Sequence, residues 1–233
     1  MGELNLLGVS KSAAAVIFDL AFEVLKVDKF YMYSNIEAMY KTLLPVKEYD
    51  IEVKSLEHIS EACDNVFFAT PGPSNKALVF KDFFNSKLIN KNRFVNIIHP
   101  SSYCASSTEL NKGILIEPMS VISSQTIIEF GVFIKRGVSI GHHNHIGAFT
   151  DLNPGVTTSG NVRIGTGCEI GTGAVIRDGI TIGNNTVIGM GSVVTKDIPA
   201  NCVAYGNPCK VVKSNLKNEI EELLLELEAK KYD

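Results

Sequence analysis

The feature that most constrains this chain is an aliphatic residue at almost every sixth position from Leu110 to Val194. Of the fifteen positions in the series, fourteen carry Ile, Leu or Val, and the exception is Thr158. Such residues make up roughly a quarter of an apolar-rich chain, so chance would supply about four of them. The period is therefore a property of the fold. The aliphatic positions are Leu110, Ile116, Ile122, Ile128, Ile134, Ile140, Ile146, Leu152, Ile164, Ile170, Ile176, Ile182, Ile188 and Val194.

A six-residue period matches neither the 3.6-residue turn of an α-helix nor the alternation of a simple hairpin. It predicts a coil with three short flat sides and about eighteen residues per turn, with the aliphatic positions pointing inward. The position four residues later is mostly small or apolar, so we expect it to face the core as well. These residues are Val132, Val138, Val156, Val162, Cys168, Ala174 and Ile180. We expect a parallel β-helix over residues 101–213.

Residues 1–100 follow a different pattern, in which apolar strand-like runs alternate with amphipathic helical segments. The order strand, helix, strand predicts a small Rossmann-like α/β domain with a parallel sheet, which would bind ligands at the carboxyl ends of its strands. The successive segments are LNLLGVS, KSAAAVIFDLAFEVL, KFYMYSN, VFFAT, PGPSNKALVFKDFF and RFVNIIHP.

The first turn of this domain carries only part of a dinucleotide-binding fingerprint. Gly8 is followed by Ser10 and Ala13, where further glycines would stand. From this turn alone, a nucleotide site and a purely structural domain fit equally well.

The last segment, residues 214–233, places Leu216, Ile220, Leu223, Leu224 and Leu227 at helical spacing. We expect a C-terminal α-helix that packs against the core or another subunit. Its strongly acidic polar face argues against a membrane role.

Composition excludes several classes of function. The formal net charge is −3, with 22 basic and 25 acidic residues, so nothing favours nucleic acid or an anionic membrane as partner. The five cysteines form an odd set without a CxxC pair, which suggests neither a disulfide framework nor a zinc ribbon. The start, MGELNLLGVS, lacks the basic residues and long apolar run of a signal peptide. We expect a cytoplasmic protein with small-molecule partners.

Three of the five histidines lie in the segment IGHHNHIG, residues 140–147. Relative to the inward Ile140, His142, His143 and His145 occupy outward positions, and Asn144 takes the inward position usually held by a small residue. An outward cluster is either exposed to solvent or placed in a cleft between neighbouring prisms. The repeat by itself leaves both arrangements open.

The chain as a whole resembles the hexapeptide-repeat sugar acetyltransferases, which include sialic acid O-acetyltransferases and UDP-4-amino-sugar N-acetyltransferases of surface glycan biosynthesis. The segments that carry the resemblance are IIHPSS, GILIEPMSVI, IGHHNHIG, LNPGVTTSGNVRIG, IGTGAVI, IGMGSVVTKDIP and GNPCK. The resemblance implies a left-handed β-helix, an exception to the usual handedness of parallel crossovers. It also implies a homotrimer with acetyl-CoA in the groove between neighbouring prisms, and no metal.

The resemblance assigns catalytic roles within the histidine segment. The family's general base matches His142, which would deprotonate a sugar amine or hydroxyl as it attacks the thioester of acetyl-CoA. The next residue in the family is usually an acid that orients the base, and this chain has His143 instead. A neutral histidine with a reference pKa near 6.5 can accept a proton at pH 7 unaided.

The resemblance also implies binding residues. Acetyl-CoA would lie near Asp151, Gly160, Thr172, Met190 and Lys210. Asp151 stands where the family often has a CoA-contacting histidine, so we expect it near the pantetheine arm, away from phosphate. The nucleotide-linked amino sugar would contact Ser10, Lys11, Ser12, Ser34, Asn35 and Gly72.

Three functions therefore compete. N-acetylation of a nucleotide-linked amino sugar is the leading hypothesis, and acyl transfer to a sugar or sialic acid hydroxyl is the second. A zinc enzyme of the carbonic-anhydrase type would use histidines at subunit interfaces, but spacings of one and three residues fit a tetrahedral site poorly.

Overall fold

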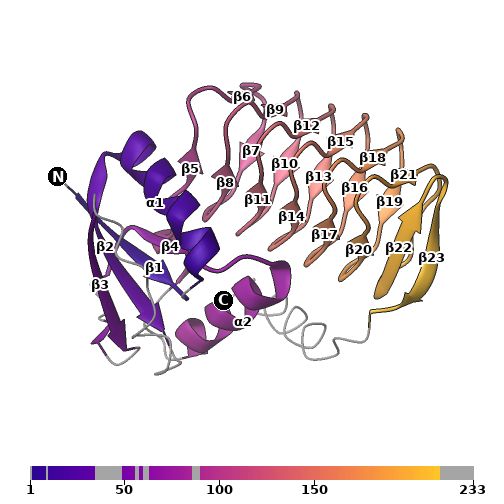
Figure 1. Ribbon diagram of the computed structural model, residues 1–233. Helices are drawn as coiled ribbons and strands as arrows, with labels where there is room; N and C mark the ends of the chain where they lie inside the picture. Colours follow the sequence, from indigo (N-terminus) through magenta and orange to yellow (C-terminus); the bar gives the residue numbers. More distant parts are fainter. Residues whose placement is uncertain are drawn as a thin grey trace.

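The computed structural model describes residues 2–8, 10–34, 49–55, 58–59, 63–85 and 90–215. The chain begins with an α/β domain and continues as a long prism of stacked coils (Figure 1). The expected C-terminal helix over residues 214–233 lies almost entirely outside the described residues. Ser214 itself ends the last strand of the prism.

The N-terminal domain contains a parallel sheet of four strands in the order β3-β2-β1-β4. The strands are β1 (Gly2–Leu7), β2 (Val27–Ser34), β3 (Asp50–Ser55) and β4 (Val66–Phe68). The described residues of this domain also form helices α1 (Lys11–Leu25) and α2 (Pro73–Asn85) and a short 3-10 helix (Lys91–Arg93). The strand order reverses between β1 and β4, which is where open α/β sheets form their ligand crevice. The predicted Rossmann-like domain is confirmed.

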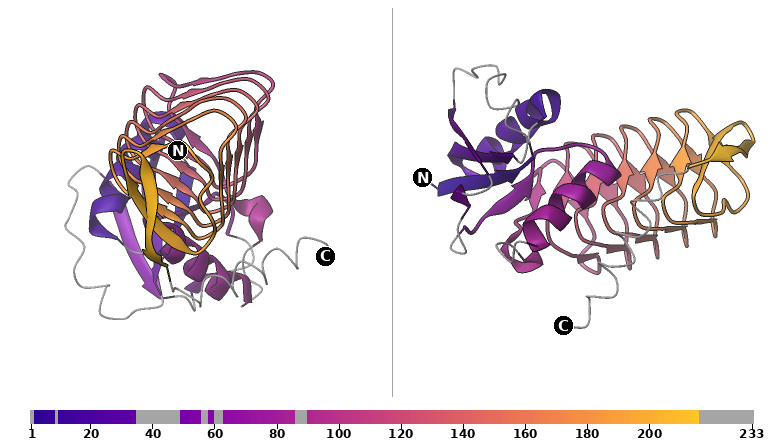
Figure 2. Two further views of the ribbon diagram at one scale, coloured as in Figure 1. Left: turned by 90° about the vertical axis from the view of Figure 1, so that its right-hand side faces the viewer. Right: turned by 90° about the horizontal axis from the view of Figure 1, so that it is seen from below.

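The prism has three parallel sheets, one on each side (Figure 2). The first comprises β5 (Ile97–Ile98), β8 (Leu115–Ile116), β11 (Phe133–Ile134), β14 (Asp151–Leu152), β17 (Glu169–Ile170), β20 (Val187–Ile188) and the hairpin β22 (Cys202–Gly206) and β23 (Cys209–Ser214). The second comprises β6 (Tyr103–Cys104), β9 (Val121–Ile122), β12 (Ser139–Ile140), β15 (Thr157–Thr158), β18 (Val175–Ile176) and β21 (Val193–Val194). The third comprises β7 (Glu109–Leu110), β10 (Ile127–Ile128), β13 (His145–Ile146), β16 (Arg163–Ile164) and β19 (Thr181–Ile182).

Each strand pairs with the strand eighteen residues later, so one coil contains three hexads. Ile128 lies beside Ile146, and Ile146 lies beside Ile164. From Ile116 onward, the predicted inward series is buried, and it shares one hydrophobic core with the second inward series, Val132 to Ile180. The predicted parallel β-helix is therefore confirmed. Its first strand, β5, begins a few residues before the expected boundary at residue 101.

The corners of the coils impose one backbone requirement. The third residue after each inward position from Leu110 to Ile188 has a positive φ angle, usually in glycine, such as Gly131 at 68°. Six corners place another residue there: Met119, Gln125, His143, Phe149, Asn161 and Asn185. His143, at 57°, is thus a left-handed corner residue, whereas His142 just before it is not.

The exception in the inward series, Thr158, is explained by a buried polar cluster. Asn144 is 1% exposed, and its amide donates to the Thr158 hydroxyl at 2.5 Å and to the Ser159 carbonyl at 3.1 Å. The Asn144 carbonyl oxygen accepts from the Val162 backbone N–H at 2.6 Å. A threonine can therefore replace an aliphatic residue here because its hydroxyl has a buried partner.

Replacing Asn144 with Ala should destabilise the β-helix by about 2–4 kcal/mol, because it leaves buried polar groups unpaired and opens a small cavity. The measurement is the free energy of unfolding by chemical denaturation. The matched pair Thr158→Val and Thr157→Val tests the same cluster, since Thr157 is the exposed neighbour on β15. Thr157→Val should change stability by less than about 0.5 kcal/mol. Equal effects of the two threonine variants would contradict this account.

The core of the α/β domain includes outward-facing rings of the first coils and is separate from the inward core of the β-helix. Phe67 and Phe68 of β4 pack against Phe133 of the β-helix, and the Phe67 and Phe133 rings are stacked with centroids 5.6 Å apart. Phe130 and Phe149 extend the same cluster, and all of these rings are buried. The β-helix and the α/β domain are therefore held in a fixed orientation.

Candidate active site

The histidine pair projects from the corner between β12 and β13, and both side chains are exposed. The Nδ1 atoms of His142 and His143 are 3.0 Å apart, and the two rings are nearly perpendicular at 87°. A contact between two ring nitrogens requires that one of them carries the proton. When His142 donates through Nδ1, the lone pair that can accept a proton is on its Nε2.

The next coil leaves space for the His142 ring. Gly160 lies directly beside it, and a Cβ atom at that position would stand 2.7 Å from Nε2 of His142. The same Cβ would stand 2.9 Å from Oδ1 of Asp178, one coil further on. The structure therefore brings together His142, His143 and Gly160 of the predicted residues. It adds Asp178, which the sequence analysis did not single out.

His145 belongs to a different environment. Its Nε2 lies 3.0 Å from Oε1 of Glu129, on the sheet that runs from β7 to β19. The neighbouring hollow, about 280 Å³ in volume, is lined by Arg163, Thr181 and Asn184. Within the described ranges, no group of three His, Cys, Asp or Glu side chains is arranged to hold a metal ion.

Thr172 and Met190 occupy another corner of the prism, between the sheet of β17 and β20 and the sheet of β18 and β21. Both are exposed, Met190 by 79%. Lys210 is exposed on β23 at the far end of the prism. Of the predicted cofactor residues, Gly160 thus lies on the His142 edge of one sheet, and Thr172 and Met190 lie on the other edge of that sheet.

The sheet between these two edges, β6 to β21, presents an uncharged outer face. The side chains that point outward belong to Tyr103, Val121, Ser139, Thr157, Val175 and Val193. Tyr103 is 61% exposed, and Val121 and Val175 are also exposed. The sheet of β7 to β19, in contrast, carries Glu109, His145 and Arg163 outward.

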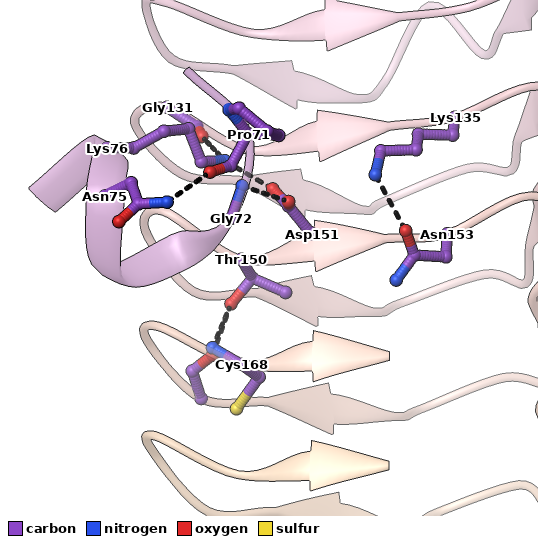
Figure 3. Close-up of polar contacts among 11 residues, drawn as sticks. Pro71, Gly72, Asn75, Lys76, Gly131, Lys135, Thr150, Asp151, Asn153 and Cys168 are labelled. Carbon is purple, nitrogen blue, oxygen red and sulfur yellow. Dashed lines mark hydrogen bonds and ion pairs between the residues drawn. The ribbon is translucent and has the colours of Figure 1, made fainter. Parts of the chain in front are cut away.

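The expected role of Asp151 at the cofactor is corrected by its position. Its side chain is buried beneath α2, where Oδ1 accepts from Lys76 Nζ at 2.5 Å and Oδ2 accepts from the Gly72 backbone N–H at 3.1 Å (Figure 3). Lys76 also donates to the Gly131 carbonyl at 2.6 Å. Burial lowers the pKa of Lys76, and the adjacent carboxylate opposes that shift. The repeat pattern does not reveal this contact, because position 151 points outward from the coil and is buried only by the packing of α2 on the β-helix.

The described members of the predicted substrate-binding set lie at or shortly after the ends of β1, β2 and β4. Ser10 precedes α1, Ser34 ends β2 as a buried residue, and Gly72 precedes α2 with a φ of 87°. Lys11 and Ser12 lie in the first turn of α1, and Asn35 lies outside the described residues.

A hollow of about 210 Å³ lies between α1, Pro71 and the first coils. Its polar lining consists of Glu117, Lys135 and Arg136, three residues that the sequence analysis did not select. Lys135 donates to Asn153 at 2.7 Å (Figure 3), and Arg136 lies 3.5 Å from the Glu117 carboxylate. In the sequence, the signal that could have identified these residues is the basic pair Lys135 and Arg136 directly after the inward Ile134.

Residues 161–196 match the family model described as bacterial transferase hexapeptide (six repeats). No curated protein sequence matches the chain. None of the helices in the described segments is long and apolar enough to cross a membrane.

Several solved structures share the fold over most of the chain. A histidine-to-asparagine variant of perosamine N-acetyltransferase from Caulobacter crescentus, in complex with CoA and GDP-perosamine, has a TM-score of 0.73 at 22% identity, covering 92% of this chain and 98% of that one. The acetyltransferase domain of PglB from Neisseria gonorrhoeae has a TM-score of 0.77 at 23% identity, covering 90% and 99%. WeeI from Acinetobacter baumannii has a TM-score of 0.76 at 22% identity, covering 91% and 100%. The predicted resemblance is confirmed in the hexapeptide repeat and in the overall fold.

Replacing Asp151 with Ala should destabilise the protein by about 3–5 kcal/mol, because the Lys76 cation would remain buried without its carboxylate. The double variant Lys76→Met with Asp151→Leu should recover most of this loss, since no unpaired charge is left inside. Thermal and denaturant unfolding measure both effects. Lys135→Met, at a half-buried lysine on the same sheet, is the control and should cost about 1 kcal/mol or less. An Asp151→Ala protein as stable as wild type would contradict the assignment.

Proposed function

We propose that the chain is an acetyl-CoA-dependent N-acetyltransferase acting on the amino group of a nucleotide-linked amino sugar, with His142 as general base. The observation that carries this proposal is the His142 ring, set against Gly160 with its Nδ1 in contact with His143. The similar solved structures support the choice of chemistry, since they include a perosamine N-acetyltransferase variant with CoA and GDP-perosamine and an acetyltransferase domain of PglB with acetyl coenzyme A. Transfer to a sugar hydroxyl is the second candidate.

His142 performs the proton transfers in the proposed reaction. As the acceptor amine attacks the thioester carbonyl carbon, Nε2 of His142 takes a proton from the amine nitrogen. The carbon–sulfur bond then breaks, and the imidazolium returns this proton to the leaving thiolate. His143 accepts from Nδ1 of His142 and holds the tautomer that leaves Nε2 free, a role usually played by a carboxylate. No covalent acyl-enzyme is required.

The positions of the predicted residues favour a site between subunits. Gly160 and Met190 lie on opposite edges of the uncharged sheet, so in one chain they face different grooves. A rotationally symmetric ring of prisms uses two different patches of each chain in every contact, so one edge of each prism meets the other edge of its neighbour. We therefore propose a homotrimer in which acetyl-CoA lies between the His142 edge of one protomer and the Met190 edge of the next.

The hollow between α1 and the first coils is the proposed site of the nucleotide-linked sugar. Lys135 and Arg136 supply positive charge there, and the strand order of the sheet places its ligand crevice on the side where β1 and β4 end. The diphosphate of a nucleotide sugar would be attracted to this charge.

The function is tested by incubating the protein and acetyl-CoA with GDP-, UDP- and dTDP-linked 3-amino and 4-amino sugars and with sialic acids, while free CoA is followed. We expect CoA release with at least one amino sugar and formation of its N-acetyl product. Release with sialic acid alone would establish the hydroxyl alternative. Release with no acceptor would reject the proposed function.

His142→Asn should lower kcat by about two to four orders of magnitude with little effect on the fold or on CoA binding, because only the general base is lost. His143→Asn should cost less, and Asn is the suitable replacement because it tolerates the left-handed backbone at this corner. His145→Asn is the control outside the proposed machinery and should be close to wild type. The assignment fails if His142→Asn keeps near-normal turnover or if His143→Asn is the more damaged variant.

Val175→Glu should dissociate the trimer, because it introduces a charge into the uncharged face between the two edges. Light scattering would then report a mass close to that of one chain, 25.4 kDa, and activity would be lost. Ile127→Glu is the matched control, since Ile127 has similar exposure, 39% against 42%, on the sheet of β7 to β19. A wild-type protein that is monomeric, or a Val175→Glu protein that remains trimeric, would contradict the proposed assembly.

A further inference from the structure

Asp178 lies in the same corner column as His142, two coils further along the prism, with Gly160 between them. Nε2 of His142 and Oδ1 of Asp178 are 2.7 Å and 2.9 Å from the point where a Cβ atom of residue 160 would stand. An imidazole nitrogen of His142 and a carboxylate oxygen of Asp178 therefore both lie beside Gly160, which has no side chain.

The His142 ring and the Asp178 carboxylate can each form a further hydrogen bond with a ligand. Nδ1 of His142 is engaged with His143, which leaves Nε2 for a ligand. The Asp178 carboxylate is exposed and receives a long contact of 3.4 Å from the Asn161 amide. Within the described residues, no hydrogen bond joins Asp178 to His142. When His142 donates to His143 through Nδ1, His142 Nε2 and Asp178 Oδ1 are both acceptors, and the protein donates little to either.

We propose that Asp178 binds the acceptor amino group beside His142 and thereby selects nitrogen over oxygen as the acyl acceptor, an inference that rests on the proposed function. An ammonium group has three N–H donors, so it can donate to both acceptors and is attracted by the carboxylate charge. A sugar hydroxyl has a single proton and can donate to only one of them. A hydroxyl acceptor would leave the carboxylate without a donor.

Each proton that leaves the acceptor nitrogen has a defined path in this arrangement. The bound ammonium gives one proton to Nε2 of His142, which releases it to solvent, and the neutral amine keeps an N–H bond to Asp178. The nitrogen lone pair attacks the thioester carbonyl carbon. Nε2 then takes a second proton from nitrogen and passes it to the departing CoA thiolate. The products are the amide, the CoA thiol and one proton in solution.

The test compares wild type with Asp178→Asn and Asp178→Glu. The acceptors are the GDP-, UDP- and dTDP-linked 4-amino sugars and their 4-hydroxy counterparts. Glu169→Gln is the control, because Glu169 is an exposed acid on the adjoining sheet, away from the His142 corner. Binding of each acceptor is measured by calorimetry in the presence of CoA, and turnover is measured with acetyl-CoA.

For wild type, we expect the amino sugar that is turned over to bind at least tenfold more tightly than its hydroxy counterpart. Asp178→Asn should raise the KM and Kd of that amine by about tenfold, since the amide can still accept a hydrogen bond but no longer carries the charge that attracts the ammonium. The KM of acetyl-CoA should not change. Asp178→Glu should recover part of the loss, and Glu169→Gln should behave as wild type.

Two results would overturn the inference while leaving the proposed function intact. The first is an active Asp178→Asn protein with an unchanged KM for the amine, and the second is a rise in the KM of acetyl-CoA alone, which would assign the carboxylate to the cofactor. If wild type releases no CoA with any amine, the proposed function itself fails. Equal binding of the amino and hydroxy sugars would reject amine selection regardless of turnover.

Discussion

The structure depends on the parallel pairing of each strand with the strand eighteen residues later. This pairing stacks equivalent residues of successive coils in columns along the prism, so a side chain meets the residue eighteen positions further on. His142 lies against Gly160 for this reason, and Asn144 accepts from the Val162 backbone for the same reason. The inward aliphatic series supplies the hydrophobic stabilisation, and the column arrangement fixes which polar groups can meet.

The second determinant is the contact between the α/β domain and the first coils. A cluster of phenylalanine rings around Phe68 packs the first coils into the core of the α/β domain, and the buried pair of Lys76 and Asp151 adds an electrostatic contact between the two domains. Asp151 also accepts from the Gly72 backbone, so the loop that precedes α2 is tied to the β-helix. Replacing a buried ion pair by apolar residues is often tolerated, whereas removing one partner is not. We regard this pair as a device that sets orientation more than one that adds stability.

The proposed chemistry uses few groups because the prism positions them well. In the proposed reaction, His142 needs its proton held on Nδ1 and an open approach to Nε2, and the corner offers His143 as a hydrogen-bond partner for Nδ1 and Gly160 beside Nε2. An acid in place of His143 would fix the tautomer more strongly, since a carboxylate is only an acceptor. A carboxylate is nevertheless present, at Asp178, on the other side of the imidazole. Its position suits an interaction with the acceptor amine better than orientation of the base.

The sequence by itself determined the β-helix, its eighteen-residue coil, the α/β character of the first domain and the outward placement of His142. These follow from periodic patterns in which each residue interacts mainly with its own strand, corner or neighbouring coil. The tertiary structure alone decided that Asp151 is buried under α2, that His145 pairs with Glu129 and that Asp178 approaches His142. Such contacts join residues that are far apart in the chain or depend on how a helix docks. An outward position in the repeat says that a side chain leaves the coil, and only the packing of other elements decides whether it meets solvent, an ion partner or a substrate.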